Sequence, residues 1–234
     1  MSRIILIETS TALCSAALAV DGKVVAYRES EEPKAHAAMT APYVKEVLDA
    51  EGLTVRDCDA VCVSMGPGSY TGLRVGVSTA KGLCFGAGIP LLAVPTLEVL
   101  AFQAVAEGLL PDGCTAIVPM VDARRMEVYT AVFSPEGKAL SETEPRIIEE
   151  GSFDDLLGKG PVLFIGDGAE KCRAVLSAGP FGGNAFFAGE CPKASSMAAP
   201  AFRDFNAKSF RDTAYFEPFY LKDFVATVSR KKLF

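Results

Sequence analysis

Two short stretches decide the fold: Arg3-Ile-Ile-Leu-Ile-Glu8 near the start of the chain and Thr115-Ala-Ile-Val-Pro-Met-Val-Asp122 near its middle. Each is a run of apolar, β-branched-rich residues that ends on a carboxylate, which predicts a buried strand with an acid at its end. The two acids are 114 positions apart, and the turn glycines that follow them, Gly22 and Gly137, are 115 apart. This matched spacing predicts an internal duplication.

The rest of the first half alternates apolar strands with helices, as in an α/β fold. The predicted helix over 38–51 has Thr40 available as its cap and Pro42 in its first turn. A glycine-rich loop, GPGSYTG over 66–72, precedes a predicted helix over 73–87. The other predicted elements are the strands 12–20, 23–29, 59–65 and 89–94 and the helix 96–107.

The second half opens in the same way, with a strand over Met126–Phe133, a turn at Pro135-Glu136-Gly137 and a third strand. A strand over Val162–Ile165, a helix over Ala169–Ala178 and a short strand near 184–188 follow. We therefore expect two duplicated lobes, 1–108 and a smaller 109–234, each a mixed sheet flanked by helices. The last segment is expected to pack back on the first lobe. Two such lobes describe the actin-like architecture of actin, Hsp70 and the sugar kinases.

Composition excludes several classes of function. The net charge is −6 over 234 residues, and an acidic chain repels phosphate backbones, which argues against direct binding of DNA or RNA. No apolar run reaches the roughly 18 residues that span a bilayer. Seven cysteines without CxxC spacing indicate reduced thiols, so we expect a cytoplasmic protein.

The chain contains one histidine, His36. Zinc proteases of the H-E-x-x-H type need two histidines, and no G-x-S-x-G elbow is present for a serine hydrolase. No P-loop motif is present either. We therefore predict no catalytic residue and no metal site.

The paired strand ends suggest where a nucleotide would lie. In α/β folds, ligands bind at the carboxyl ends of strands and at helix N-termini. Here that edge would carry the hydroxyl-rich turn after Glu8 and the glycine-rich turn at Gly166–Gly168. From spacing alone, an equal alternative to a nucleotide site is that the first turn is merely tight and that the two acids are solvated strand ends. The residues of this candidate nucleotide site are Glu8, Thr9, Ser10, Thr11, Asp122, Gly166 and Gly168.

Glycines recur along the helix over 73–87 and its approach. Each costs about 1 kcal/mol relative to alanine inside a helix, so close packing must offset them. Gly72, Gly76 and Ala80 recur every four residues and form a strip that another backbone can approach closely. Its partner would be the helix over 38–51 or a second chain. Across chains, Gly76→Leu would break the association and leave the fold intact. If Gly76 faces the core of its own chain, the same change would unfold the protein.

Four stretches together resemble one family. They are Ser64–Glu98 with its SMGPGSYTGLRVGVSTAKGL block, Ile7–Thr11, Val121–Arg125 and Ile165–Gly168. The sequence is similar to the TsaB (YeaZ) family, paralogues of TsaD, over nearly the whole chain. Two residues depart from what related proteins carry: Glu8 replaces a common Asp, and Thr40 replaces the second histidine of the H-x-x-x-H metal pair of TsaD.

The resemblance implies an actin-like fold and a non-catalytic scaffold that is not a protease. Such a scaffold acts with TsaD and the ATPase TsaE to transfer threonylcarbamoyl to N6 of adenosine 37 in tRNAs that read ANN codons. It implies a homodimer when alone, contact with tRNA only through the complex, and no cofactor beyond ATP or ADP bound weakly or in the complex. The implied partner interface comprises Met39, Tyr43, Val47, Gly72, Leu73, Gly76, Ala80 and Leu83.

A second function of a different class stays open at this point. An actin-like fold is also compatible with an ATP-dependent phosphotransferase acting on a small metabolite. That activity would need a dedicated base and a substrate pocket between the lobes, and no acid in the sequence stands in a context that marks it as that base.

Overall fold

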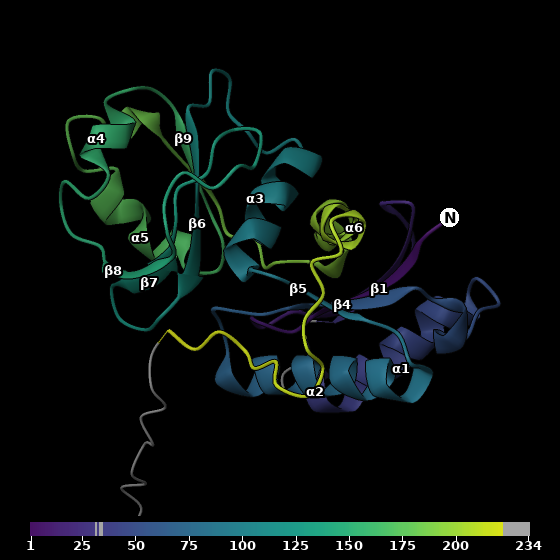
Figure 1. Cartoon of the computed structure of the whole chain (residues 1–234). Coiled ribbons are helices and arrows are strands. Elements are labelled where there is room, and N and C mark those ends of the chain that lie inside the picture. The colour runs from purple at the N-terminus through teal and green to yellow at the C-terminus, as the bar shows by residue number, and fades with distance from the viewer. Residues whose placement is uncertain (31, 33–34, 222–234) are drawn as a thin grey trace, which may run out of the picture.

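A computed structural model describes residues 1–30, 32 and 35–221, and within them the chain forms two five-stranded sheets (Figure 1). In the first sheet the strand order is β3-β2-β1-β4-β5. The strands β1 and β2 are antiparallel, whereas β1, β4 and β5 run parallel. The strands are β1 (Arg3–Glu8), β2 (Cys14–Val20), β3 (Lys23–Ser30), β4 (Ala60–Ser64) and β5 (Leu91–Val94).

The second sheet repeats this topology. Its order is β10-β9-β6-β7-β8, with β6 and β7 antiparallel and β6, β9 and β10 parallel. Glu8 and Asp122 are the last residues of the equivalent strands β1 and β6. The predicted two-lobed α/β architecture is therefore confirmed. The strands are β6 (Ala116–Asp122), β7 (Glu127–Thr130), β8 (Glu144–Ile147), β9 (Val162–Ile165) and β10 (Ala185–Ala188).

The predicted repeat is less regular in the second lobe than in the first. After Gly22 the chain enters β3 at once, but after Gly137 it makes only an isolated bridge between Phe133 and Ala139 before β8 begins at Glu144. Phe133 pairs with Ile117 in the same register in which Thr130 of β7 pairs with Met120 of β6, so the predicted strand over Met126–Phe133 resumes at Phe133 after leaving the regular ladder at residues 131 and 132. Gly22 and Gly137 both have positive φ in the turn that follows the second strand of their lobe, so the two turns are equivalent.

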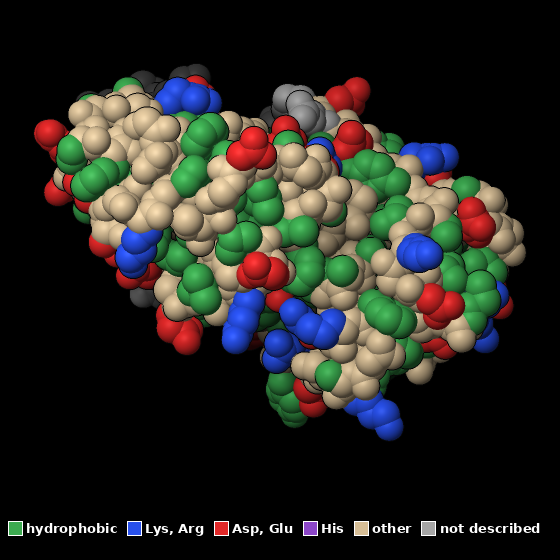
Figure 2. Space-filling model, turned by 90° about the horizontal axis from the view of Figure 1, so that it is seen from above, with side chains coloured by type: hydrophobic (Ala, Val, Ile, Leu, Met, Phe, Trp, Pro, Cys, Tyr) green, Lys and Arg blue, Asp and Glu red, His purple; other side chains and the backbone are tan. Residues whose placement is uncertain are grey.

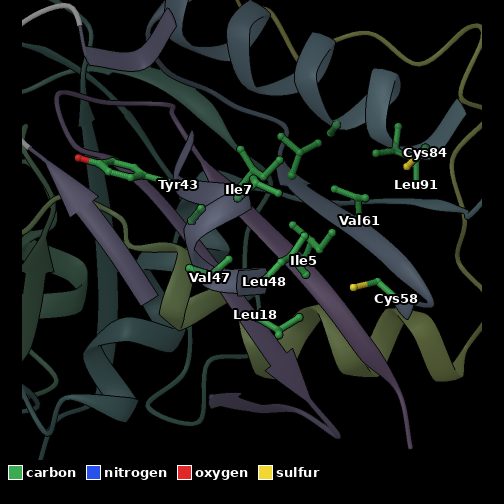
Figure 3. Packing of buried hydrophobic residues seen from close by; sticks show 14 of the residues in the cluster. Ile5, Ile7, Leu18, Tyr43, Val47, Leu48, Cys58, Val61, Cys84 and Leu91 are labelled. Carbon is green, nitrogen blue, oxygen red and sulfur yellow. The ribbon is translucent and has the colours of Figure 1, made fainter. Parts of the chain in front are cut away.

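Two helices cover one face of the first sheet, α1 (Ala35–Asp49) and α2 (Tyr70–Ala87). Their apolar sides close a core that Figure 3 shows from close by, with Val47 and Leu48 of α1 and Cys84 of α2 against Ile5 and Val61. Such apolar burial stabilises the lobe at about 25 cal/mol per Å². The α1–α2 packing agrees with the expected proximity of these helices.

The opposite face of the first sheet is covered by residues from the end of the chain. Ala194, Met197, Ala198 and Ala201 pack on Leu6 and its neighbours. These four residues belong to the short helix η3 (Ala194–Met197) and to α6 (Ala198–Asn206), so the chain returns to the first lobe after completing the second sheet. The basic tail at Arg230–Lys232 lies outside the described residues. The remaining helices are η1 (Val55–Asp57), α3 (Thr96–Ala106), α4 (Asp154–Leu157), α5 (Ala169–Leu176) and η2 (Gly182–Asn184).

Two helix starts differ from the prediction. The helix α1 begins at Ala35, so Thr40 lies inside it, where its hydroxyl donates to the carbonyl of His36 at 2.6 Å instead of capping the helix. The helix α2 begins at Tyr70 with Ser69 as its cap, whose Oγ accepts from the N–H of Gly72. A threonine hydroxyl inside a helix can bond to the carbonyl four residues before it, and the sequence pattern does not distinguish this position from a cap.

The molecular surface carries both signs of charge. Figure 2 shows one face on which Lys or Arg and Asp or Glu side chains are interspersed rather than gathered by sign. In the part of the chain that the structure describes, no helix is both long and apolar enough to cross a membrane.

Candidate functional site

The turn after β1 carries the first predicted acid, and this acid is buried. Glu8 is fully enclosed, and its Oε1 accepts from the backbone N–H of Ser10 at 2.6 Å and from Ser64 Oγ at 2.8 Å. Ser64 ends β4, the parallel neighbour of β1, so the sheet itself brings the two side chains together. The other carboxyl oxygen of Glu8, Oε2, has no hydrogen-bond partner among the described residues. The prediction of a solvated strand end is wrong for Glu8.

Burial changes the acidity of this carboxyl. Loss of water around the charged form raises the pKa of Glu8 to about 7, although the hydrogen bonds from Ser10 and Ser64 act in the opposite direction. A carboxyl with this pKa is partly protonated at neutral pH. Such a group differs from a free carboxylate that would hold the magnesium ion of a nucleotide.

The glycine-rich loop seals the same turn. The N–H of Ser69 donates to the carbonyl of Ser10 at 2.6 Å, and Thr9 Oγ1 donates to the carbonyl of Gly72 at 2.8 Å. A side chain at Gly68 would collide with the carbonyl of Ser10, and one at Gly72 with the carbonyl of Thr9. The turn predicted to face a phosphate is thus occupied by residues 66–72 of the same chain.

This packing also accounts for the glycine strip. Gly76 faces Thr9 Oγ1 and Val63, and Ala80 is fully buried. The two glycines of the strip therefore meet the β1–β2 turn and the sheet, and their lack of a side chain lets α2 lie directly on this turn. Gly76→Leu should consequently unfold the lobe, which is the second of the two outcomes that the sequence left open.

We expect Gly72→Ala to destabilise the isolated protein by about 1–3 kcal/mol or more, because its methyl group has no room beside Thr9. A matched control lies on the same helix: a Cβ at Gly82 meets nothing within 4 Å. Gly82→Ala should stabilise the helix by about 1 kcal/mol. Chemical denaturation of both variants measures the two effects, and equal stabilities would contradict this account of the strip.

The matching turn of the second lobe is open to solvent. Asp122 is exposed, its carboxylate pairs with Lys171, and its backbone N–H donates to Asp167 Oδ1 at 2.9 Å. Gly166 and Gly168 lie against the carbonyl of Met120, so a side chain at Gly166 would strike that backbone. At this turn an ion pair with Lys171 holds the carboxylate of Asp122. Burial raises the pKa of the neighbouring Asp167. Lys171 was not among the predicted site residues; its place on the first turn of α5 is the signal that sequence reasoning missed.

The single histidine, His36, contacts the turn between β1 and β2. His36 Nε2 lies 3.0 Å from the carbonyl oxygen of Thr11, in hydrogen-bond contact. Within residues 1–30, 32 and 35–221, no three His, Cys, Asp or Glu side chains gather as a metal ligand set would.

The predicted interface residues divide into two groups. Tyr43, Val47, Leu73 and Ala80 are buried inside the first lobe, as are Gly72 and Gly76. Met39 and Leu83 are only partly buried and lie at the margin of the same core. Most of the predicted residues therefore support the two helices from within.

The outer side of α2 presents a different set of residues. Phe85 is 88% exposed, although it is a large apolar side chain. Two grooves lie along α2: one of about 470 Å³ between α2 and η1 is lined by Val55, Leu83 and Gly86 among others, and one of about 670 Å³ is lined by Gly82 and Phe85 and by residues 212–214. Sequence reasoning missed Phe85. The spacing of Gly82 and Gly86 around an aromatic residue is the signal that marks it.

Residues 212–220, near the end of the described chain, form a strap whose first three residues line the second groove. Lys81 Nζ donates to the carbonyls of Ala214 and Phe216 at 3.1 and 3.0 Å, and the N–H of Phe219 donates to the carbonyl of Met65. The rings of Tyr70 and Tyr220 lie 5.0 Å apart. The strap thus fixes both the glycine-rich loop and one side of α2.

Two duplicated sheets with an acid at the end of each first strand define a protein of the actin-like class. The fold is shared with the inorganic polyphosphate/ATP-glucomannokinase of Arthrobacter sp. strain KM, at 10% identity and a TM-score of 0.50 over 89% of this chain and all of that one. The family model for TsaD, described as tRNA N6-adenosine threonylcarbamoyltransferase, matches residues 30–227.

Closer similarities identify the family. The TsaB proteins of Escherichia coli and Bacillus subtilis are 36% and 35% identical, over 63% and 70% of this chain. These alignments span 65% and 70% of the two relatives. A Pseudomonas aeruginosa structure, described as similar to the peptidase YeaZ, superposes with a TM-score of 0.81 at 26% identity, over 95% of this chain and all of that one. The chain belongs to the TsaB (YeaZ) family.

Proposed function

We propose that this chain is a non-catalytic subunit in the biosynthesis of threonylcarbamoyladenosine in tRNA. It would hold a TsaD-type enzyme, which with a TsaE-type ATPase transfers threonylcarbamoyl to adenosine 37 of tRNAs that read ANN codons. The family supports the pathway, since the curated relatives are named for threonylcarbamoyladenosine biosynthesis. The outer surface of α2 supports the role of a binding subunit.

That surface is the observation that carries the proposal. An exposed aromatic ring at the wall of a groove has the form of a binding hot spot, since such an anchor fills a partner's pocket while the partner fills the groove beside it. Gly82 and Gly86 add no side chain there, so a partner helix can approach the backbone of α2 closely. We assign to this surface both the TsaD-type partner and, in its absence, a second copy of the chain.

The sealed turn after β1 favours a binding role over phosphotransfer. Glu8 is buried with a pKa of about 7, and the glycine-rich loop over 66–72 is hydrogen-bonded to this turn through Ser69 and Ser10. We propose that the isolated chain holds no nucleotide at this turn, and that ATP or ADP binds weakly or only within the complex. The acidic net charge of −6 supports contact with tRNA through the other subunits.

Co-purification tests the proposal directly. A tagged chain should retain its cognate TsaD-type protein at stoichiometric ratio, and an excess of untagged chain should compete for it. Titration calorimetry with Mg-ATP should show no binding heat for the chain alone. Stoichiometric ATP binding with turnover, together with no retention of the partner, would favour the phosphotransferase instead.

A further inference from the structure

The helix α3 belongs to the first half of the sequence but lies between the two lobes (Figure 1). Leu97, Leu100 and Ala104 pack with Ile117 of β6 and Ile165 of β9 in one fully buried cluster. On its other side, Val99 packs with η3 and α6 in the core of the first lobe. A single helix thus contributes to the cores of both lobes.

The same helix grips the chain where it passes back from the second lobe to the first. Gln103 is fully buried, its Nε2 donates to the carbonyl of Cys191 at 3.1 Å, and its Oε1 accepts from the N–H of Lys193 at 3.1 Å. One amide side chain therefore satisfies two backbone groups of this returning segment, the crossover 189–194. Leaving either group buried and unpaired would be costly, so the contact fixes the backbone of this segment.

Neighbouring contacts hold the same segment. Lys193 Nζ pairs with Glu107 Oε1 at 2.9 Å, at the C-terminal end of α3, and with Glu190 Oε2 at 3.3 Å. The N–H of Ala194 donates to Ser15 Oγ of β2 at 3.0 Å, and Ser15 is itself buried. The returning crossover is thereby bonded to both α3 and the first sheet.

We propose that α3 and the crossover 189–194 form a fixed joint, so that the two lobes move as one rigid body and do not open and close around a ligand. Domain closure needs a few hinge residues that can change their backbone torsions. In this joint Gln103 and Ser15 bond to backbone groups of three crossover residues, Cys191, Lys193 and Ala194. The packing of α3 on β6 and β9 resists sliding of one lobe against the other. The proposal stands on these contacts and does not depend on which partner the chain binds.

Hydrogen exchange on the full chain tests the joint. In the wild type, the N–H groups of Lys193 and Ala194 should exchange with the slowest group of amides, together with the buried strands. Gln103→Met keeps the side-chain volume and removes both hydrogen bonds, and it should speed exchange at Lys193 by about 10–100-fold. Ser15→Ala should act on Ala194 in the same way without touching α3. The control Val105→Gln, on the exposed side of α3, should change neither rate.

Small-angle scattering supplies a measurement that needs no variant. The scattering profile of the wild type should match the profile expected for the two lobes as the structure arranges them. Fast exchange at Lys193 in the wild type, unchanged exchange there in Gln103→Met, or a scattering profile that requires a second, more open arrangement of the lobes would each overturn the rigid joint.

Discussion

Replacing Phe85 with glutamate should abolish association with the TsaD-type partner and with a second copy of the chain, while the fold remains intact. Phe85 is 88% exposed, so nothing in the lobe depends on it. Aromatic anchors typically contribute about 2–4 kcal/mol to binding, which corresponds to a loss of roughly 30–1,000-fold in affinity. A carboxylate placed in the same contact adds a desolvation cost.

Sedimentation and pull-down measure the two associations of Phe85→Glu, and thermal melting measures its fold. Leu140→Glu is the matched control, because Leu140 is also an exposed apolar residue but lies in the second lobe. It should retain both associations. If Phe85→Glu binds the partner and itself as the wild type does, the outer surface of α2 is not the interface.

Glu8→Gln should remove a pH dependence from the stability of the protein. The pKa of Glu8 is 4.5 in an exposed setting and about 7 in the folded chain, so between these values the native state binds more protons than the unfolded state. The free energy of unfolding of the wild type should therefore fall as the pH rises from 4.5 through 7, by about 3 kcal/mol in total. Below pH 4.5 the carboxyl is protonated in both states and contributes no slope.

Glutamine keeps an oxygen for Ser10 and Ser64 and carries no charge, so Glu8→Gln should lose this slope and exceed the stability of the wild type at pH 8. Urea unfolding at several pH values gives the comparison. Glu51→Gln is the control, since Glu51 is exposed and lies outside this network. A wild type whose stability is level between pH 4.5 and 7, or one that matches Glu8→Gln throughout, would show that Glu8 ionises freely.

Repeating patterns made the architecture predictable. The two acid-ended strands and their spacing indicate the duplication, which the matching strand orders of the two sheets confirm. A buried strand can be recognised from its own sequence, because burial in the sheet requires a run of apolar residues. The turn at Gly137 was predicted, but the irregular pairing between Phe133 and the start of β8 at Glu144 was not, because the apolar pattern does not show where a strand leaves its ladder.

The site was less predictable, because its environment comes from distant segments. Glu8 is buried by Ser64 and by the loop around Gly68, which lie about 56 to 60 positions away in the sequence. The glycine strip gives a sound signal of close packing, but the partner, Thr9, is chosen by the tertiary fold. Burial also reverses the expected roles on α2, since the periodic small residues face inward and the isolated Phe85 faces out.

The role of a binding subunit is tested most directly by a reconstituted reaction with tRNA, threonylcarbamoyl-adenylate, Mg-ATP and the cognate TsaD-type and TsaE-type proteins. Modified adenosine is measured with the wild type, with Phe85→Glu, with no chain added, and with the chain as the sole protein. We predict product in the first case and little or none in the other three. Product formed by the chain alone, or an undiminished yield in its absence, would contradict the proposal.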